Sequence, residues 1–262
     1  MSDRRRLVVG TANWNELRCF YPRGTKQDEK LAYYATQLTA VEVNATFFRM
    51  LPPSTIARWA DQTSDDFTMS LKAHRLISGW LRNPDKAVQD GFDKHVAMVQ
   101  PAVDAGKFLA FLIQFPGKLE ASTELERGLG VVREGFGDLP LVVQLPPTSD
   151  AGLRTRIGSA LKDTNIAQVR HDPASVDDQA EAIESGDVTY FRFRGAELTP
   201  EGDTDRAVYS DAEIAMRADL AEAAASSDGT IVVVFYGKKD VDTADAALRL
   251  TDKLRRREVT VG

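Results

Sequence analysis

The sequence is poor in the residue types that mark several common kinds of site. It has one cysteine, Cys19, so no disulfide can form within the chain, as suits a reducing cytoplasm. A lone thiol is more often an inert packed or surface group than a nucleophile, and we expect this of Cys19. Three histidines are too few for the multi-zinc clusters of barrel hydrolases.

Long apolar runs are also missing. The chain opens with basic residues and a short apolar stretch, whereas a signal peptide needs a longer apolar region and a small-residue cleavage site. No stretch approaches the roughly 18 apolar residues of a membrane span. We therefore expect a cytoplasmic protein that does not bind a membrane.

Several motifs of well-known sites are absent as well. The first apolar run leads into GTANWNEL, which is neither G-x-G-x-x-G nor a P-loop, so no nucleotide cofactor is expected. No G-x-S-x-G elbow supports a serine hydrolase. The net charge of −6 argues against a protein that coats nucleic acid, although a locally positive cleft stays open.

The sequence does contain a regular alternation of strands and helices. Short apolar, β-branched runs recur, each followed by a longer stretch with helical spacing. The predicted strands are 7–12, 40–45, 67–73, 108–115, 139–145, 166–171, 188–195 and 230–237. The predicted helices are 28–38, 53–63, 83–103, 122–136, 150–162, 173–185, 210–227 and 242–257.

This alternation predicts an α/β fold, a (β/α)8 TIM barrel with one domain over residues 1–262. A doubly wound open sheet is the alternative, and the missing glycine-rich loop disfavours it. Residues 200–211 are expected to form a loop after strand seven, on the face where barrel loops do chemistry.

Polar residues recur near the ends of the predicted strands. Side chains alternate across a strand and the helix-facing side must be apolar, so these polar side chains are expected to line the barrel mouth. The predicted mouth residues are Thr11, Asn13, Glu42, Asn44, Lys72, His74, Gln114, Gln144, Gln168, Arg170, Arg192, Arg194 and Tyr236. Of the other histidines, His95 is expected to face solvent from a helix, and His171 has the helix-facing parity.

The predicted mouth has an excess of positive charge. Its cations are Lys72, Arg170, Arg192 and Arg194, with His74 as a further candidate, and Glu42 is its only carboxylate. Such a mouth should attract a phosphate, a carboxylate or a nucleic-acid backbone, since arginine suits bidentate oxyanion binding. The alternative is structural: Glu42 pairs with Arg192 or Lys72 and only fixes the barrel.

The chemistry that fits this set is acid–base work beside a bound anion. Glu42 would act as general base, Lys72 or His74 as the acid, and Arg192 and Arg194 would hold an oxyanion. One histidine and one glutamate do not make a permanent metal cluster, whereas a single labile Mg²⁺ stays open. Two close carboxylates for glycoside cleavage are missing from the set.

Several segments resemble one known family. They are GTANW and FYPRG near the start, LAYYA, VEVNATFFRMLPPSTIARWA, DDFTMSLKAHRLIS, FLIQFP, YFRFRG and VVVFYG. In this order the chain resembles the YecE-like family of domains of unknown function. The resemblance implies a TIM barrel with no established activity, and a likeness to endonuclease-type barrels suggests nucleic-acid binding. It places Glu42, Asn44, Thr46, Lys72 and Arg192 at the family's polar strand ends.

The chain departs from the family pattern at several of these positions. Ala12-Asn13-Trp14 replaces serine–glycine–tryptophan, and Phe48 replaces a tyrosine. Gln144-Leu145-Pro146 stands where the family has a glutamate, an arginine and a histidine, and Tyr236-Gly237 replaces an asparagine pair. These departures leave two alternatives, a different ligand or a lost activity.

Besides a scaffold or partner-binding barrel, two classes of function remain, and whether the protein is an enzyme stays undecided. The first is an enzyme acting on an anionic small molecule, with Trp14 and Thr46 completing its ligand-binding set. The second is a non-catalytic nucleic-acid binder with cations around the mouth and aromatic side chains that stack on bases. Its further cations are Arg75, Lys238 and Lys239, and its aromatics are Trp14, Phe47, Phe48 and Trp80. The oligomeric state and the substrate are not determined.

Overall fold

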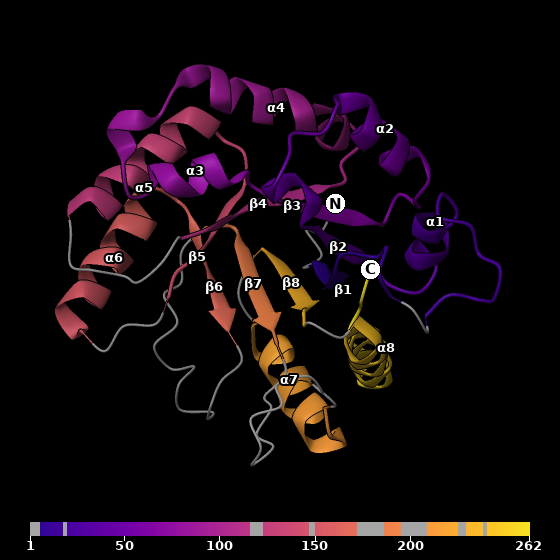
Figure 1. Cartoon of the computed structure of the whole chain (residues 1–262). Helices are drawn as coiled ribbons and strands as arrows, with labels where there is room; N and C mark the ends of the chain where they lie inside the picture. The colour runs from indigo at the N-terminus through magenta and orange to yellow at the C-terminus, as the bar shows by residue number, and fades with distance from the viewer. Residues whose placement is uncertain are drawn as a thin grey trace, which may run out of the picture.

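Eight parallel strands close into a barrel in chain order, and β8 pairs back with β1. The computed structural model describes residues 6–17, 20–115, 123–146, 150–171, 186–194, 209–224, 229–237 and 240–262. Figure 1 shows the strands in the middle of the molecule and the helices around them. The predicted (β/α)8 barrel is confirmed.

All eight predicted strands are present, most of them shorter than expected at their ends. They are β1 (Arg6–Ala12), β2 (Ala40–Val43), β3 (Thr68–Lys72), β4 (Phe108–Gln114), β5 (Leu141–Gln144), β6 (Ala167–His171), β7 (Val188–Phe193) and β8 (Thr230–Phe235). The shortest, β2 and β5, stop just before the residues that turn toward the mouth.

The helices follow the predicted order where the chain is described. The α-helices are α1 (Lys30–Ala35), α2 (Pro53–Asp61), α3 (Arg75–Trp80), α4 (Gln89–Asp104), α5 (Thr123–Phe136), α6 (Ala151–Asp163), α7 (Asp211–Ala224) and α8 (Asp240–Arg256). Two 3-10 turns, η1 (Ala45–Phe47) and η2 (Pro84–Lys86), lie among them. The predicted helix 173–185, most of the loop 200–211, and Cys19 lie outside the described residues.

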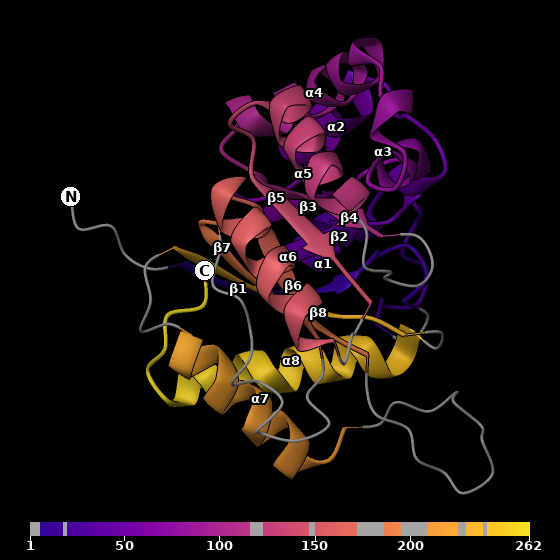
Figure 2. The ribbon, with the colours of Figure 1, turned by 90° about the vertical axis from the view of Figure 1, so that its left-hand side faces the viewer.

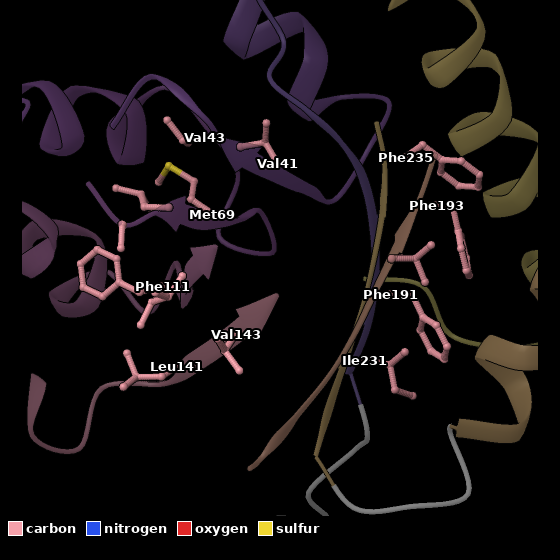
Figure 3. Packing of buried hydrophobic residues seen from close by; sticks show 14 of the residues in the cluster. Val41, Val43, Met69, Phe111, Leu141, Val143, Phe191, Phe193, Ile231 and Phe235 are labelled. Atoms are coloured by element: carbon pink, nitrogen blue, oxygen red, sulfur yellow. The ribbon is translucent and has the colours of Figure 1, made fainter. Parts of the chain in front are cut away.

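The barrel separates two apolar layers. Val8, Ala110, Val142, Tyr190 and Val232 belong to the smaller cluster, which fills the inside of the barrel. The larger cluster packs between strands and helices. Figure 3 shows members of the larger cluster on opposite walls of the barrel, with their side chains directed toward the surrounding helices. Apolar burial on both sides of the strands is what holds the mouth rigidly.

The alternation rule gave the wrong side for two strands. In β6, Val169 pairs with Tyr190 inside the barrel, whereas Arg170 pairs with Phe191 on the helix-facing side. Gln168 also takes the helix-facing parity, and His171 pairs with Arg192 on the inward one. The reason is that the inside of the barrel below the mouth is also apolar. Apolar residues at alternate positions of a strand can therefore face either the barrel interior or the helices.

The prediction that Thr11 of β1 lines the mouth was wrong as well. It is buried against α1, where its Oγ lies 3.0 Å from the hydroxyl oxygen of Tyr34 and its N–H donates to that oxygen. A hydroxyl can satisfy its hydrogen bonds on the helix side, so a threonine carries little information about which side it faces.

His95 does not face solvent, contrary to the prediction. It is 3% exposed and lies between Phe111 and Phe136, with ring centroids 5.8 Å from each. Its Nδ1 lies 2.6 Å from the carbonyl oxygen of Gly91, and its Nε2 accepts from the backbone N–H of His74. Both ring nitrogens are satisfied, which lets α4 bury a histidine.

Helices α7 and α8 lie side by side below the barrel in the view of Figure 2. Arg249 of α8 bonds Asp211 at the start of α7, and Arg257 bonds Asp219 further along. The chain then returns to the barrel, where Gly262 donates its N–H to the carbonyl oxygen of Leu7 at 3.1 Å.

Candidate functional site

A buried ion pair crosses the inside of the barrel near its carboxyl-terminal end. Glu42 on β2 is completely buried, and its Oε1 accepts a hydrogen bond from Nη2 of Arg192 on β7 at 2.9 Å. The Nε of Arg192 lies 2.9 Å from Oε2 of Glu42. β8 and β1 lie between these two strands in the barrel order, so the pair joins strands that are not neighbours.

Arg192 is held from two further sides. Its Nη1 donates to Oε1 of Gln144 on β5, and its guanidinium carbon lies 4.1 Å from the ring centroid of Tyr236 after β8. Burial alone would lower the pKa of Arg192, but attraction to Glu42 and to the two tyrosines Tyr190 and Tyr236 raises it above its usual value. Arg192 therefore stays charged.

Tyr190 and Ser70 complete this network, although neither was in the predicted site. The Tyr190 hydroxyl donates to Oε2 of Glu42 at 3.1 Å, and Oγ of Ser70 lies 2.7 Å from the Tyr190 oxygen. Burial, and then the charge of Glu42, raise the pKa of Tyr190 well above its usual value. Both residues share the parity of Arg192 and Lys72, which is the sequence signal that could have found them.

Lys72, at the end of β3, is a cation of the mouth for which the described part of the chain supplies no counter-ion. It is half-buried, and its Nζ lies 4.6 Å from the ring centroid of Phe47. No described carboxylate comes within ion-pair distance of it. Burial, and then the charge of Arg192, lower the pKa of Lys72, and the more distant Glu42 opposes them.

His74 and Thr46 have structural partners instead of mouth contacts. The Nδ1 of His74 accepts from the N–H of Leu76 and so caps α3. The ring of His74 lies 6.4 Å from that of His95, on the side of α4. Thr46 is buried and donates to the carbonyl oxygen of Lys72 at 2.6 Å, which ties the turn after β2 to the end of β3.

Asn13, Trp14 and Asn44 gather beside β1 and β2, away from the ion pair. Asn13 has a left-handed backbone with φ 64°, and its Oδ1 accepts from the N–H of Asn44 at 3.0 Å. Trp14 is buried, and its ring is nearly perpendicular to that of Trp59 of α2. The Oδ1 of Asn44 is buried and has no hydrogen-bond partner within the described chain.

The remaining predicted residues are scattered. Gln114 pairs in register with Gln144 on the inward parity, and Arg194 is exposed just after β7. Arg170 lies on the helix-facing side, with its guanidinium carbon 5.7 Å from the ring centroid of Phe191, so its place among the mouth residues was wrong. Lys238 and Lys239 lie outside the described residues.

The described ranges lack two further kinds of feature, a metal-binding cluster and a membrane-spanning helix. No group of three histidine, cysteine, aspartate or glutamate side chains there is arranged to hold a metal ion. None of the described helices has both the length and the apolar character that crossing a bilayer requires.

Comparisons with other proteins agree with this architecture. A curated protein, the UPF0759 protein YunF of Bacillus subtilis, is 24% identical over 140 residues. That match covers 53% of this chain and 50% of YunF, so the chain matches about half of the length of this curated relative.

Two solved structures are similar over nearly the whole chain. A DUF72 family protein from Enterococcus faecalis has a TM-score of 0.78 at 20% identity, with 95% of both chains covered. One from Thermotoga maritima has a TM-score of 0.74 at 19% identity and covers 96% of this chain and 100% of its own. At sequence identities of 19–20%, this structural similarity shows that the fold is shared and nothing more.

The family itself follows from a match along the sequence. The family model described as "Protein of unknown function DUF72" matches residues 8–261, which include most of β1 and all of β2 to β8. The narrower YecE-like designation stays a prediction. The chain belongs to the DUF72 family, a family of TIM-barrel proteins whose description assigns no function.

Proposed function

We propose that the mouth of the barrel binds the anionic group of a small molecule between Lys72 and Arg192. The observation that carries the proposal is the missing counter-ion of Lys72. A half-buried ammonium next to a buried guanidinium is repelled by it and has no described carboxylate within ion-pair distance. A bound phosphate or carboxylate would supply that charge.

Arg192 has donors left for such a ligand. A guanidinium carries two N–H groups on each terminal nitrogen. Nη1 donates to Gln144, Nη2 donates to Glu42, and Nε faces the other oxygen of Glu42. One N–H on each terminal nitrogen is therefore available, which is the pair that binds an oxyanion in a bidentate way.

Glu42 fits a positioning role better than the role of general base. Both of its oxygens contact Arg192, one of them also accepts from Tyr190, and the side chain is wholly buried. A base must reach the proton that it abstracts. Lys72 is only half-buried, and its lowered pKa makes its ammonium group a better proton donor, so we assign the role of acid to Lys72.

The binding step is tested with inorganic phosphate as the probe. Thermal unfolding is measured in sodium phosphate and in sodium chloride of equal ionic strength, for the wild type and for Lys72→Met. The wild type should unfold at a higher temperature in phosphate, by roughly 2–4 °C per kcal/mol of binding free energy. Lys72→Met should lose most of this difference.

The matched control is Lys162→Met, because Lys162 is an exposed lysine in the last turn of α6. This variant should keep the full response to phosphate. The same response in Lys72→Met as in the wild type would show that the anion binds elsewhere, and the proposal would be withdrawn.

A second candidate, the binding of nucleic acid, is favoured by one observation. Phe48 is 74% exposed and is followed by the exposed Arg49, which is a stacking ring beside a cation. The other proposed stacking rings are less available, since Trp14 and Trp80 are buried and Phe47 lies under Lys72. Affinity for a single-stranded oligonucleotide that falls steeply with salt, and that Phe48→Ala weakens, would favour this candidate.

A further inference from the structure

A second cavity lies outside the network of Glu42 and Arg192. It has a volume of about 370 Å³, within the roughly 300–1,000 Å³ that is usual for small-molecule sites. Its walls come from the segment after β1, the segment after β2, and α2. Neither Lys72 nor Arg192 lines it.

Two arginines of this cavity have no carboxylate partner. Arg49 and Arg58 both line it and both are exposed, and no ion pair or hydrogen bond of either side chain is recorded in the described chain. Some exposed arginines do pair with a carboxylate, as Arg127 does with Asp85 and Arg156 with Glu126. Among the described residues, no acidic side chain lines the cavity. Two cations without neighbouring carboxylates favour an anionic ligand.

An aromatic pair forms another part of the wall. The rings of Trp14 and Trp59 meet edge to face, with centroids 4.9 Å apart and an interplanar angle of 86°. Trp14 is 4% exposed, whereas Trp59 is only partly buried. Trp14 therefore supports Trp59, and the indole surface of Trp59 is available to a flat ligand.

The inner wall of the cavity is fixed by the barrel. Asn13 donates its N–H to the carbonyl oxygen of Glu42 at 2.8 Å, and its side chain accepts from Asn44. The left-handed backbone of Asn13, a conformation that asparagine tolerates better than most residues, makes both bonds possible. The cavity is thus formed before any ligand arrives, which lowers the entropic cost of binding.

We propose that this cavity binds a small molecule in which a planar ring is joined to a phosphate, as in a nucleoside monophosphate. The ring lies against Trp59, and the phosphate lies between Arg49 and Arg58. The amides of Asn13 and Asn15 provide hydrogen bonds to the polar edges of the ligand. This assignment uses none of the groups that we propose for the barrel mouth.

The tryptophans allow a direct test. The chain has three, of which Trp14 and Trp59 line the cavity, while Trp80 packs against Phe92. Adenosine 5′-monophosphate is titrated while tryptophan fluorescence is followed at red-edge excitation, with adenosine and inorganic phosphate as partial ligands. The monophosphate should quench in a saturable way, and each partial ligand should bind roughly tenfold or more weakly.

Charge variants locate the phosphate. Arg49→Gln and Arg58→Gln should each weaken binding of the monophosphate roughly tenfold. Arg255→Gln removes the same charge from an exposed position in the last turn of α8 and should bind like the wild type. Lys72→Met should also bind normally, which separates this site from the one in the mouth. Far-ultraviolet circular dichroism checks that each variant is folded.

Three outcomes would overturn the proposal. They are no saturable quenching by the monophosphate, wild-type affinity in both arginine variants, and equal loss of affinity in Arg255→Gln. A single-stranded oligonucleotide that binds far more tightly than the monophosphate, with the same dependence on Arg49 and Arg58, would reassign the cavity to nucleic acid and reject the small-molecule ligand.

Discussion

Glu42 and Arg192 show what a buried charge does at the scale of a single residue. Each of the two has the other as its counter-ion, and both are almost completely removed from water. Desolvation of two charges offsets much of their attraction, so the intact pair stabilises the fold little. Removing one member leaves the other buried without its counter-charge, which is costly.

We therefore expect Glu42→Gln to lower the free energy of unfolding by about 3 kcal/mol, measured by urea denaturation. Glutamine keeps the shape of the side chain, so the loss reports charge and not a cavity. The control is Glu126→Gln, whose partner Arg156 is 44% exposed, and it should cost less than about 1 kcal/mol. Equal losses in the two variants would contradict this account.

His95 is a second residue whose burial has a measurable consequence. Burial lowers its pKa, the bond to Gly91 opposes this, and His74 lowers it further. The unfolded chain then binds a proton near pH 6.5 that the folded chain does not bind at that pH. The stability that neutral His95 contributes is complete above about pH 6.5 and is lost as the pH falls below it.

The test compares the free energy of unfolding at about pH 7.5 and about pH 5.5 in the wild type and in His95→Asn. Asparagine keeps a donor near the position of Nδ1 but does not titrate, so the variant should lose less stability on acidification. An NMR titration that gives His95 a pKa at or above that of an exposed histidine would refute the prediction.

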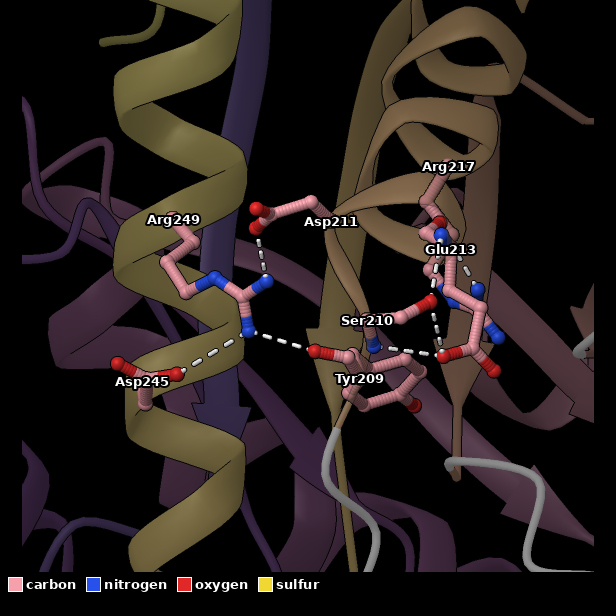
Figure 4. A network of polar contacts seen from close by, with 7 residues as sticks. All are labelled: Tyr209, Ser210, Asp211, Glu213, Arg217, Asp245 and Arg249. Atoms are coloured by element: carbon pink, nitrogen blue, oxygen red, sulfur yellow. Dashed lines mark hydrogen bonds and ion pairs between the residues drawn. The ribbon is translucent and has the colours of Figure 1, made fainter.

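At the scale of an element, α7 begins with a reciprocal cap. The N–H of Glu213 donates to Oγ of Ser210, while the N–H and the hydroxyl of Ser210 both donate to Oε2 of Glu213 (Figure 4). Arg249 of α8 joins this start by donating to the carbonyl oxygen of Tyr209 at 2.6 Å. The S-x-x-E spacing signals such a cap in the sequence.

Ser210→Ala should lower the free energy of unfolding by about 1 kcal/mol, because it removes the cap of α7. Ser159→Ala is the control: Ser159 is exposed within α6, and no hydrogen bond of its hydroxyl is recorded within the described chain. Alanine is the better helix former, so this control should be neutral or slightly stabilising. A neutral Ser210→Ala would show that Arg249 holds the helix start without the cap.

At the scale of the whole molecule, closure of the barrel depends on a close approach of β1 to β2. A Cβ at Gly10 would lie 1.8 Å from the carbonyl oxygen of Ala40, which is a backbone atom and cannot turn aside. Because β1 also pairs with β8, a displacement of β1 affects both sides of the closure. Only glycine fits there.

Gly10→Ala should cost at least about 3 kcal/mol of unfolding free energy and should reduce the soluble yield. Gly130→Ala makes the same chemical change within α5, where a Cβ meets no atom within 4 Å. That control should gain about 0.5–1 kcal/mol. Similar stabilities of the two variants would show that the two strands can separate without cost.

The sequence determined the barrel, because eight apolar runs separated by amphipathic helices can bury their surface in few other ways. It also placed Glu42, Lys72, Gln144, Arg192 and Tyr236 on one end of the barrel, since charged and amide side chains at strand ends are costly to bury against the apolar helices. It did not give the sides of β6, because the barrel is apolar inside and outside.

Only the tertiary structure decided which of the polar residues contact one another. Glu42 meets Arg192 across the barrel and Tyr190 within it, while no carboxylate of the described residues pairs with Lys72. Trp14 meets Trp59, and His95 turns inward to His74. These contacts join residues that are far apart in the chain. They form only once the strands have closed into a barrel and brought the side chains together, so no local pattern in the sequence could have predicted them.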